Sequence, residues 1–474
     1  MDTNLKKHLT HPVFKVASQI VSEQGLEAYV VGGFVRDLIL GRPSKDIDIV
    51  VVGNGLELAK ACAEKLRVKK VSFFDHFGTA HFIYKDLDIE FVGSRKESYN
   101  EHSRNPKIST GTLKDDQERR DFTINALAID LRQENFGELL DPFEGIGDLE
   151  KGVIRTPLDP EKTFSDDPLR MMRAIRFATQ LNFKIEIDCL NSIANNAQRL
   201  NIISKERIMT ELNKIILSDQ PSRGFKLLMS TKLLHQFFPE LVKLYGIEKI
   251  NGKSHKDNFH HTLEVLDNIC EVTDNLWLRW SAILHDIAKP NTKRFDDKVG
   301  WTFHGHEELG ARMVPKIFKR LRLPLDNKMK YVQKLVRLHL RPIALVKGNV
   351  TDSAVRRLLF EAGDDIEDLM KLCNADITSK NEFRVKRYKK NFEEVERKLK
   401  TVEEKDRLRN FQPPISGKEV MDTFNLEPCH TVGIIKNKIK EAILEGEIEN
   451  NRDQAFNFML ELGKELGLIV KLKA

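Results

Sequence analysis

The sequence has few cysteines and no long apolar run, and both absences narrow the class of protein. Its five cysteines, among 474 residues, show neither paired nor metal-ligand spacing, which excludes a disulfide framework and favours reduced, mostly buried thiols. The longest apolar stretches, such as "IDIVVV", fall far short of the roughly 20 residues that span a bilayer. The N-terminus has no apolar core followed by a small-residue cleavage site. We therefore expect a cytoplasmic protein with no membrane partner.

The sequence also has no large excess of positive over negative charge. The formal net charge of +6 is mild for this length, so it is compatible with a polyanionic partner without establishing one. The stretch "RVKRYKK", residues 384–390, is locally basic and could follow an RNA backbone, although such a run is more often a solvated helix face. The sequence contains no internal repeat and no low-complexity tract. Its length suits about three domains of roughly 150 residues each.

The distribution of residue types divides the chain into a mixed part and a helical part. Residues 1 to about 145 contain β-branched segments ("AYVV", "IDIVVV", "LDIEFV", "TINALAIDL") separated by glycines and helical stretches. From about residue 155 the pattern is helical almost throughout. The stretch "GIEKINGKSHKDN" is the best candidate domain boundary, and "NFQPPISG" is a further break because two prolines interrupt helical sequence.

Two aspartates, Asp46 and Asp48, stand one residue apart in "SKDIDIVVVG". On a strand they would lie side by side on one face, with Ile47 and Ile49 turned into the core. Adjacent carboxylates repel unless a cation lies between them, and Mg²⁺ prefers such oxygen ligands together with substrate phosphates. "LDIEFVGSR" offers a third carboxylate, Glu90, with Asp88 as the alternative. Taken alone, such a pair is more often a solvated strand end.

The preceding segment, "YVVGGFVRDLILG", predicts a strand that turns through Gly32 and Gly33 into a helix. Such a turn lets the backbone approach a phosphate and directs amide N–H groups at it. Arg36 follows within the first helical turn, where it could reach a triphosphate. A glycine pair followed about a dozen residues later by D-x-D indicates phosphoryl or nucleotidyl transfer.

"ERRDFTINALAID" contributes Arg119, Arg120 and Asp121, and then Asn125 four residues on. These charges could form a structural salt bridge. The functional alternative places an arginine on phosphate and Asp121 or Asn125 on the ribose hydroxyls, because arginine suits bidentate oxyanion contacts.

In "FSDDPLRMMRAIRF", Asp167 precedes a proline as a helix N-cap does. Arg170 and Arg173 lie one helical step apart, opposite an apolar face formed by Met171, Ala174, Ile175, Ala178 and Leu181. An aspartate and an arginine on one rigid helix could present an acceptor and a fork of donors to the edge of a base.

Three segments, "VVGGFVRDLILGRPSKDIDIVVVG", "RRDFTINALAID" and "DPLRMMRAIRFATQLNF", resemble the signature motifs of class II CCA-adding enzymes. These are the tRNA nucleotidyltransferases that share a family with poly(A) polymerases. The resemblance spans roughly residues 28–215. It implies that Asp46 and Asp48 bind catalytic Mg²⁺, that Gly33 and Arg36 hold triphosphate, and that the R-R-D motif binds triphosphate and selects ribose. The family motif E-D-x-x-R reads "DDPLR" here, so Asp167 and Arg170 would pair with the base of CTP or ATP, with Arg173 in support. Asp166 replaces the usual glutamate.

A second set of residues follows the order H…HD…D of HD-domain phosphohydrolases. The candidate metal ligands are His261, His285, Asp286, His306, His339 and Asp376, with His304 as a further possibility. Imidazole and carboxylate ligands together suit a transition metal such as Mn²⁺, Ni²⁺ or Fe²⁺ better than Mg²⁺. Some CCA-adding enzymes carry such a domain with phosphatase or 2′,3′-cyclic phosphodiesterase activity. A satisfied structural histidine–aspartate pair is the alternative.

The resemblance implies an α+β protein in which a nucleotidyltransferase domain, with a mixed β-sheet and helices, precedes all-α neck, HD and C-terminal helical domains. We expect a catalytic head at 1–150, a nucleotide-selecting and RNA-binding neck at 151–250, an HD domain at 251–380 and a tRNA-binding body and tail at 381–474. The expected reaction is template-independent addition of C, C and A from CTP and ATP to tRNA. A poly(A) polymerase, an enzyme adding only CC or only A, and a metal-dependent phosphohydrolase are the alternatives.

Overall fold

The structure, a computed structural model, describes residues 4–74, 78–100, 103–347, 351–378, 381–406, 409 and 411–470. For residues 97–100, 103–108, 346, 347, 382, 384 and 389 it describes the backbone only. The chain forms two compact units, Met1–Pro239 and Glu240–Ala474. This division falls before the glycine-containing stretch that the sequence predicts as a boundary. The finer division into four domains stays a prediction.

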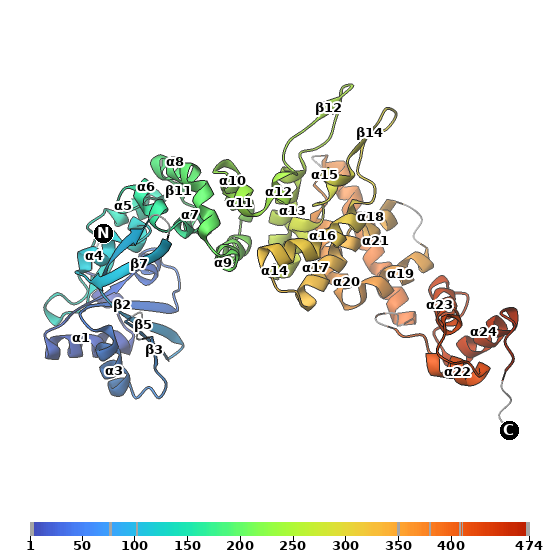
Figure 1. Cartoon of the computed structure of the whole chain (residues 1–474), viewed down its shortest axis with the longest axis horizontal. Coiled ribbons are helices and arrows are strands. Elements are labelled where there is room, and N and C mark those ends of the chain that lie inside the picture. Colours follow the sequence, from blue (N-terminus) through green and yellow to red (C-terminus); the bar gives the residue numbers. More distant parts are fainter. Residues whose placement is uncertain are drawn as a thin grey trace. The chain divides into compact units, whose positions relative to one another are not determined.

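The first unit contains a seven-stranded sheet within the described residues, in the order β3-β4-β5-β2-β1-β8-β9 (Figure 1). Its strands are β1 (Glu27–Val31), β2 (Asp46–Val52), β3 (Ser72–Phe74), β4 (Thr79–Tyr84), β5 (Leu87–Gly93), β8 (Ala128–Asp130) and β9 (Leu139–Leu140). The β2–β5 pair is parallel and its neighbours are antiparallel, so the sheet is mixed, as the sequence predicts. A separate hairpin joins β6 (Arg95–Asn100) and β7 (Ser103–Thr110).

Strand β2 separates apolar and acidic side chains by alternation. Ile47 and Ile49 are buried, as the sequence predicts, while Asp46 is exposed and Asp48 half-buried. Helix α3 packs against β4, β5 and β2, and α1 packs against α3 and β1. The head helices are α1 (Pro12–Gln24), α2 (Gly33–Ile39), α3 (Gly55–Leu66), α4 (Leu113–Glu118) and α5 (Gly145–Lys151).

Helices follow the sheet up to the end of the first unit. They are α6 (Pro160–Asp166), α7 (Leu169–Gln180), α8 (Ile187–Asn196), α9 (Lys205–Ile216), α10 (Pro221–Ser230), α11 (Leu233–Phe237) and α12 (Pro239–Val242), the last of which runs into the second unit. The short strands β10 (Val153–Ile154) and β11 (Lys184–Ile185) pair in parallel.

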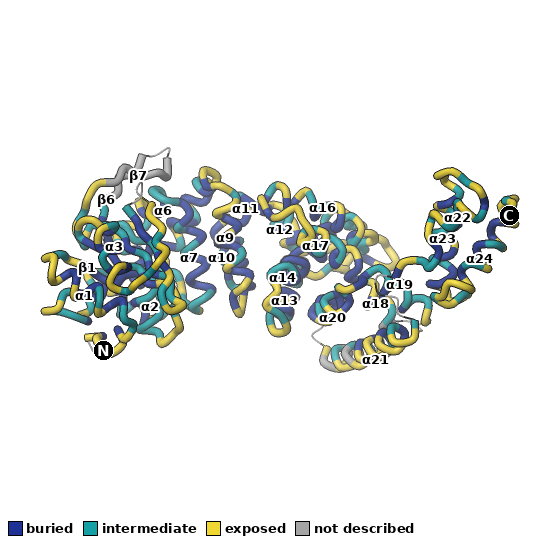
Figure 2. Tube along the Cα trace, turned by 90° about the horizontal axis from the view of Figure 1, so that it is seen from below, coloured by how far each residue is buried: buried dark blue, intermediate teal, exposed yellow. Residues whose placement is uncertain are grey.

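Helix α7 is more deeply buried than the sequence predicts. Besides the predicted apolar face, the structure buries Met172, Arg176 and Phe177, because α6, α9, α10, β10 and β11 all pack against this helix (Figure 2). Arg176 is therefore buried although it is charged. Its guanidinium is stabilised by a buried ion pair with Glu211 on α9, at 2.5 Å.

Within its described residues, the second unit is helical except for two short hairpins. Its helices are α13 (Asn258–Cys270), α14 (Leu276–Leu284), α15 (Lys289–Thr292), α16 (His306–Leu321), α17 (Asn327–Leu338), α18 (Leu340–Lys347), α19 (Asp352–Ala362), α20 (Ile366–Ala375), α21 (Glu382–Asp406), α22 (Gly417–Phe424), α23 (His430–Glu445) and α24 (Arg452–Glu465). The hairpins pair β12 (Lys249–Ile250) with β13 (Lys253–Ser254), and β14 (Arg294–Asp296) with β15 (Gly300–Thr302). The sequence predicts helices almost throughout after residue 155 and does not identify these hairpins, because strands of two or three residues are too short to show a period.

Three predictions from composition can be compared with the structure. Cys62, Cys189 and Cys373 are buried, Cys270 is half-buried and Cys429 is exposed, so the thiols are mostly buried, as the sequence predicts. The basic run 384–390 lies on α21, where Lys386, Arg387 and Lys390 are exposed, and the side chains of residues 384 and 389 lie outside the described part. No helix of the described residues is both long and apolar enough to span a membrane.

Candidate functional site

The acidic side chains predicted at the first site lie on one face of two neighbouring strands. In the parallel pairing of β2 with β5, Asp46 is opposite Asp88 and Asp48 is opposite Glu90. Residues directly opposite each other, and residues two apart on one strand, share a face. The structure therefore brings four carboxylates together. Asp88 forms an ion pair with His81 of β4, whereas Glu90 faces Asp48, which favours Glu90 as the third carboxylate.

The electrostatics of this face suit a divalent cation. Burial raises the pKa of Asp48, Arg120 opposes this shift, and repulsion from Asp46 adds to it. Burial also raises the pKa of Glu90, and the charge of Asp48 raises it further. Carboxylates that repel one another in a half-buried setting are stabilised by a cation with hard oxygen preference, such as Mg²⁺. The donor set present in the chain therefore fits the ion that the sequence predicts.

The predicted glycine turn brings the backbone close to this face. Gly32 has a φ of +77°, a left-handed conformation that favours glycine. A Cβ atom at Gly32 would lie 3.1 Å from Nη1 of Arg120 and 3.2 Å from Oδ2 of Asp48. Gly33 begins α2. The absence of a side chain at Gly32 therefore leaves space for both Arg120 and the catalytic candidate Asp48 beside the turn.

Sequence reasoning missed Asp116, which holds both arginines of the R-R-D motif. Its side chain is 0% exposed, and it forms ion pairs with Arg119 and with Arg120, the latter at 2.8 Å. Both Nε atoms donate to its two oxygens at 3.0 Å. The signal in the sequence is the spacing, because Asp116 precedes the arginines by three and four residues within a helix.

Asp121, Asn125, Arg36 and Arg173 form a buried polar chain. Oδ1 of Asp121 accepts hydrogen bonds from the Phe122 amide at 2.9 Å and from Asn125 Nδ2 at 3.0 Å, while Oδ2 accepts from Arg173 at 2.6 Å. Arg36 donates from Nη1 to Asn125 Oδ1 at 2.8 Å. In the structure these four side chains are linked to one another by hydrogen bonds and an ion pair. The triphosphate contact of Arg36 and the ribose contacts of Asp121 or Asn125 stay predictions.

Phe177, also missed from the sequence, lies at the centre of this chain. The guanidinium groups of Arg36, Arg173 and Arg176 lie 4.9, 5.4 and 3.9 Å from its ring centroid. Burial opposes the charge of Asp121, yet Arg173 and Asn125 lower its pKa to about 2. The cluster thus ties the glycine turn, the R-R-D segment and α7 together by charge as well as by packing.

The predicted base-reading pair lies at the start of α7. Oδ1 of Asp167 accepts from the Leu169 amide at 3.2 Å, as the capping alternative predicts. Arg170 is half-buried and donates to the backbone carbonyl of Arg119 at 2.6 Å. Asp166 forms no ion pair among the described residues, and burial raises its pKa. The structure therefore places Arg170 beside the R-R-D segment without the salt bridge that a glutamate at 166 would be expected to support.

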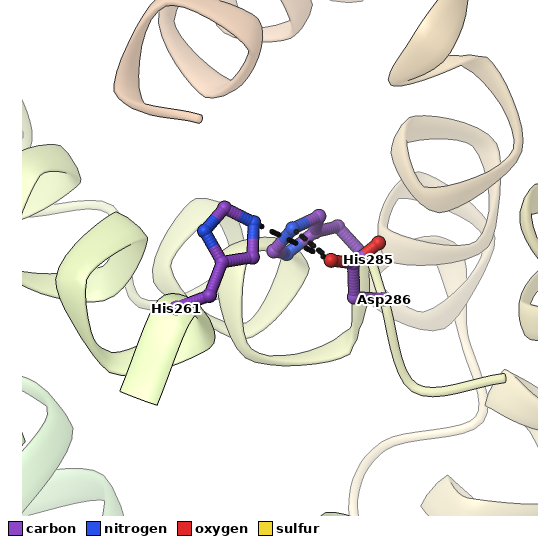
Figure 3. A group of neighbouring side chains, drawn as sticks. All are labelled: His261, His285 and Asp286. Carbon is purple, nitrogen blue, oxygen red and sulfur yellow. Dashed lines mark ion pairs between the residues drawn. The ribbon is translucent and has the colours of Figure 1, made fainter. Parts of the chain in front are cut away.

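A second cluster of predicted ligands lies in the other unit. Asp286 belongs to two groups of potential metal ligands, one with His261 and His285 and one with His306 and His339, each with ligand atoms within 4.8 Å of one another. Figure 3 shows His261, from α13, and His285 and Asp286, at the end of α14, pointing toward one another. Asp376 follows α20, and its Oδ1 lies 3.0 Å from Nε2 of His261.

The histidine side chains of this cluster are oriented for binding through Nε2. Nδ1 of His285, His306 and His339 each lies 2.7 Å from the backbone carbonyl three residues earlier. Their Nε2 atoms are buried and have no hydrogen-bond partner. Nδ1 of His261 lies 2.9 Å from the Thr378 hydroxyl. Such contacts fix the tautomer of a metal-binding imidazole, so this donor set fits the predicted transition metal.

The charges at this cluster also favour a cation. Burial opposes ionisation of Asp286, but His285 and Lys289 hold its pKa well below its usual value. Burial, together with His285, lowers the pKa of His339 to about 4, which leaves a neutral imidazole. His304 is exposed and lies in neither group, so the structure does not bring this predicted residue into the cluster.

A cavity of about 840 Å³ opens beside the second cluster. His261 and Asp376 contribute to its lining, together with Lys289 and the side chains of the two hairpins. Trp301 joins these hairpins, because its Nε1 donates to the Lys253 carbonyl at 3.3 Å. The second cluster is therefore accessible from this cavity.

Three family models match successive parts of the chain. The model described as the poly A polymerase head domain matches residues 28–155, that of a probable RNA and SrmB-binding site of polymerase A matches 182–244, and that of the HD domain matches 258–379. The first site lies within the first of these ranges, apart from the α7 residues. All six predicted ligands of the second cluster lie within the last.

Known proteins resemble the chain over different lengths. A multifunctional CCA protein of Nitrosococcus oceani is 31% identical over 370 residues, which are 74% of this chain and 84% of that protein. An A-adding tRNA nucleotidyltransferase of Aquifex aeolicus is 38% identical over 283 residues. That match covers 58% of this chain and spans only 33% of the relative's length. A solved tRNA nucleotidyltransferase complexed with a primer tRNA and an incoming ATP analogue is 26% identical, with a TM-score of 0.57, covering 81% of this chain and 99% of that one.

Proposed function

Because the chain belongs to the family of CCA-adding tRNA nucleotidyltransferases and poly(A) polymerases that carry an HD domain, we propose that it adds C, C and A in turn to the 3′ end of tRNA. CTP and ATP are the nucleotide substrates. The observation that carries this proposal is the acidic face of β2 and β5, where Asp46, Asp48 and Glu90 lie together and Asp48 lies beside the glycine turn. A cytoplasmic location stays a prediction.

The nucleotidyltransferase and HD domains both imply dependence on a divalent metal, and we assign Mg²⁺ to the carboxylates of the first site. Bound there, the metal would activate the tRNA 3′-hydroxyl for attack on the α-phosphate and stabilise the leaving pyrophosphate. Arg120 would contact the triphosphate, because its guanidinium lies between Asp116 and the catalytic face. Asp167 and Arg170 would read the base edge from α7. With these groups, the transfer reaction requires no covalent enzyme intermediate.

A purified-protein assay tests this function. The protein receives Mg²⁺, a tRNA that lacks its 3′ CCA, and CTP, ATP or both, and the products are sequenced. We expect addition to stop at CCA when both nucleotides are present. Growth of a long A tract would identify a poly(A) polymerase, and no addition in any mixture would contradict both readings.

Addition of A alone is a specific alternative, because the Aquifex aeolicus relative is an A-adding enzyme. The same assay decides it with a second substrate. On a tRNA that already ends in CC, an A-adding enzyme and a CCA-adding enzyme both add A. On a tRNA that lacks all three nucleotides, only the CCA-adding enzyme extends the chain.

We also propose a metal-dependent phosphohydrolase activity for the second cluster. The supporting observation is the set of buried Nε2 atoms of His285, His306 and His339, which form no hydrogen bond and lie 3.2, 3.2 and 3.9 Å from the carboxylate oxygens of Asp286. Mn²⁺, Ni²⁺ or Fe²⁺ fits this ligand set. Hydrolysis of a 2′,3′-cyclic phosphate in the presence of each metal tests the proposal, and inactivity with all of them would favour a structural cluster.

A further inference from the structure

Asp116 is a fully buried carboxylate next to the first site, outside the set of predicted ligands. Its Oδ1 accepts from Nε of Arg119 at 3.0 Å, and its Oδ2 accepts from Nε and Nη2 of Arg120 at 3.0 and 2.8 Å. A buried carboxylate costs several kcal/mol in desolvation unless it is paired, and here two guanidinium groups share one carboxylate. Asp116, Arg119 and Arg120 together therefore carry a net charge of +1.

The position of Asp116 is set by helix α4 and not by the arginines. Thr112 and Asp115 form a capping box that fixes the start of the helix. Gln117, the residue after Asp116, donates from Nε2 to the buried carbonyl of Ala126 at 2.7 Å. The helix therefore offers a rigid anchor for the flexible side chains of Arg119 and Arg120.

Arg120 lies between two carboxylates that compete for it. Its Nε and Nη2 are bonded to Asp116, while its Nη1 lies beside the glycine turn, where Oδ2 of Asp48 is also a near neighbour. Nη1 also donates to the backbone carbonyl of Asn125 at 3.5 Å, and Arg120 and Asp48, both among the described residues, form no ion pair. Opposite charges nonetheless attract in a half-buried site, where water screens them little. If Asp116 lost its charge, the guanidinium of Arg120 would be drawn to Asp48.

The charge state of Asp116 supports this description. Burial works against the charge of Asp116, yet Arg120 and Arg119 keep its pKa below the usual value. Nε and Nη2 of Arg120 both bond to Asp116, so the guanidinium is held on the side of Asp116.

We propose that Asp116 is a positioning residue that holds Arg120 away from Asp48, so that Asp48 remains available to the metal and Arg120 to the triphosphate. An Arg120–Asp48 ion pair would neutralise a metal ligand and occupy its oxygen. The proposal rests on the proposed function for the role of Asp48. It concerns the contacts of this chain's own residues, which can be tested without turnover.

The test is a double-mutant cycle on the full-length protein, with Mn²⁺ as the probe and electron paramagnetic resonance as the readout. A His285→Ala/Asp286→Ala background removes the shared ligands of the second cluster. In this background we expect Asp116→Asn to weaken Mn²⁺ binding about tenfold. In the Arg120→Gln background the same change should have less than about a twofold effect, because no guanidinium remains to move.

The cycle separates positioning from a simple loss of negative charge. A charge effect through space would weaken Mn²⁺ binding equally with and without Arg120, and that result would overturn the proposal, as would unchanged binding in Asp116→Asn. Glu118→Gln is the matched control, because Glu118 lies on the same helix and pairs with Lys114 in place of an arginine. Its effect should stay below about twofold. Circular dichroism confirms that each variant is folded.

The addition assay gives a second readout. Asp116→Asn should raise the Mg²⁺ concentration for half-maximal addition about tenfold and leave the rate at saturating Mg²⁺ within about threefold of the wild type. A merely structural defect would lower the saturated rate and leave the Mg²⁺ requirement unchanged, which would count against the proposal. If the wild type adds no nucleotide, the proposed function fails, while the Mn²⁺ cycle still decides the role of Asp116.

Discussion

At the scale of single residues, the carboxylates on the shared face of β2 and β5 repel one another, and a bound metal ion would reduce this repulsion. The pKa of Glu90 is raised from its ordinary 4.5, first by burial and then by the charge of Asp48. When the folded state has the higher pKa, the unfolded state releases its proton first as pH rises, so the free energy of unfolding falls through this window. Below about pH 4.5 the effect vanishes, because both states are protonated.

Glu90→Gln should therefore stabilise the metal-free protein at neutral pH. We expect its thermal unfolding midpoint in EDTA to exceed that of the wild type by about 2 °C at pH 7, with the difference disappearing near pH 4. Added Mg²⁺ should raise the midpoint of the wild type more than that of the variant. Glu64→Gln, on the exposed side of α3, serves as the control. Equal midpoints at pH 7 would mean that Glu90 is not under repulsion.

The sequence alone was sufficient to predict the arrangement of site residues that lie close together along the chain. Asp46 and Asp48 could be placed on one face because strand alternation dictates it. The choice between Asp88 and Glu90 needed the register of β2 with β5 and the contact of Asp88 with His81, which depend on pairing between distant segments. Asp116 was missed because a charged residue within a charged segment looks solvated until its burial is known.

At the scale of elements, the turn between β1 and α2 is the tightest part of the first site. Gly32→Ala should lower nucleotide addition at least about 100-fold, because the new Cβ would displace Arg120 or Asp48 by part of an ångström. The left-handed backbone adds about 1–2 kcal/mol of destabilisation. The measurement is the rate of CTP incorporation together with the unfolding midpoint.

Gly41→Ala is the matched control for this change. Gly41 also has a left-handed backbone, with a φ of +66°, but a Cβ there meets nothing within 4 Å. The control should lose similar stability and retain addition within about threefold. Equal loss of activity in both variants would mean that strain alone, and not crowding of Arg120 and Asp48, explains the effect of Gly32→Ala.

Between α13 and α20, the second cluster depends on a hydrogen bond outside the ligand set. Thr378→Val removes the hydroxyl that lies 2.9 Å from Nδ1 of His261, and it should weaken binding of Mn²⁺ or Ni²⁺ about 10- to 100-fold by calorimetry. Thr262→Val makes the same substitution where the buried hydroxyl has no hydrogen-bond partner, so metal binding should not change. Equal metal affinity in the wild type, Thr378→Val and Thr262→Val would mean that His261 does not bind the metal.

The same scale shows where pattern reasoning stops. Amphipathic periodicity predicted α7, because an apolar face repeats every three to four residues, but not the burial of Arg176 and Phe177. That burial arises from neighbours on α9 and α10, which no local pattern encodes. The two hairpins that flank the cavity in the second unit were missed because their strands have only two or three residues.

At the scale of the whole molecule, the two candidate metal centres lie in different compact units. The carboxylates of β2 and β5 belong to Met1–Pro239, and the histidine cluster belongs to Glu240–Ala474. The sequence predicted this separation from two motif sets in order along the chain. We therefore expect each chemistry to be lost without the other when its own ligands are removed.

The most direct measurement compares nucleotide addition by wild-type protein and by Asp46→Ala, on tRNA lacking its 3′ CCA with CTP, ATP and Mg²⁺, with metal binding at the histidine cluster as the internal control. The account predicts that Asp46→Ala loses addition by at least about 1,000-fold and binds metal at the second cluster as the wild type does. Addition that survives the substitution would contradict the assignment of the catalytic metal to the paired aspartates of β2.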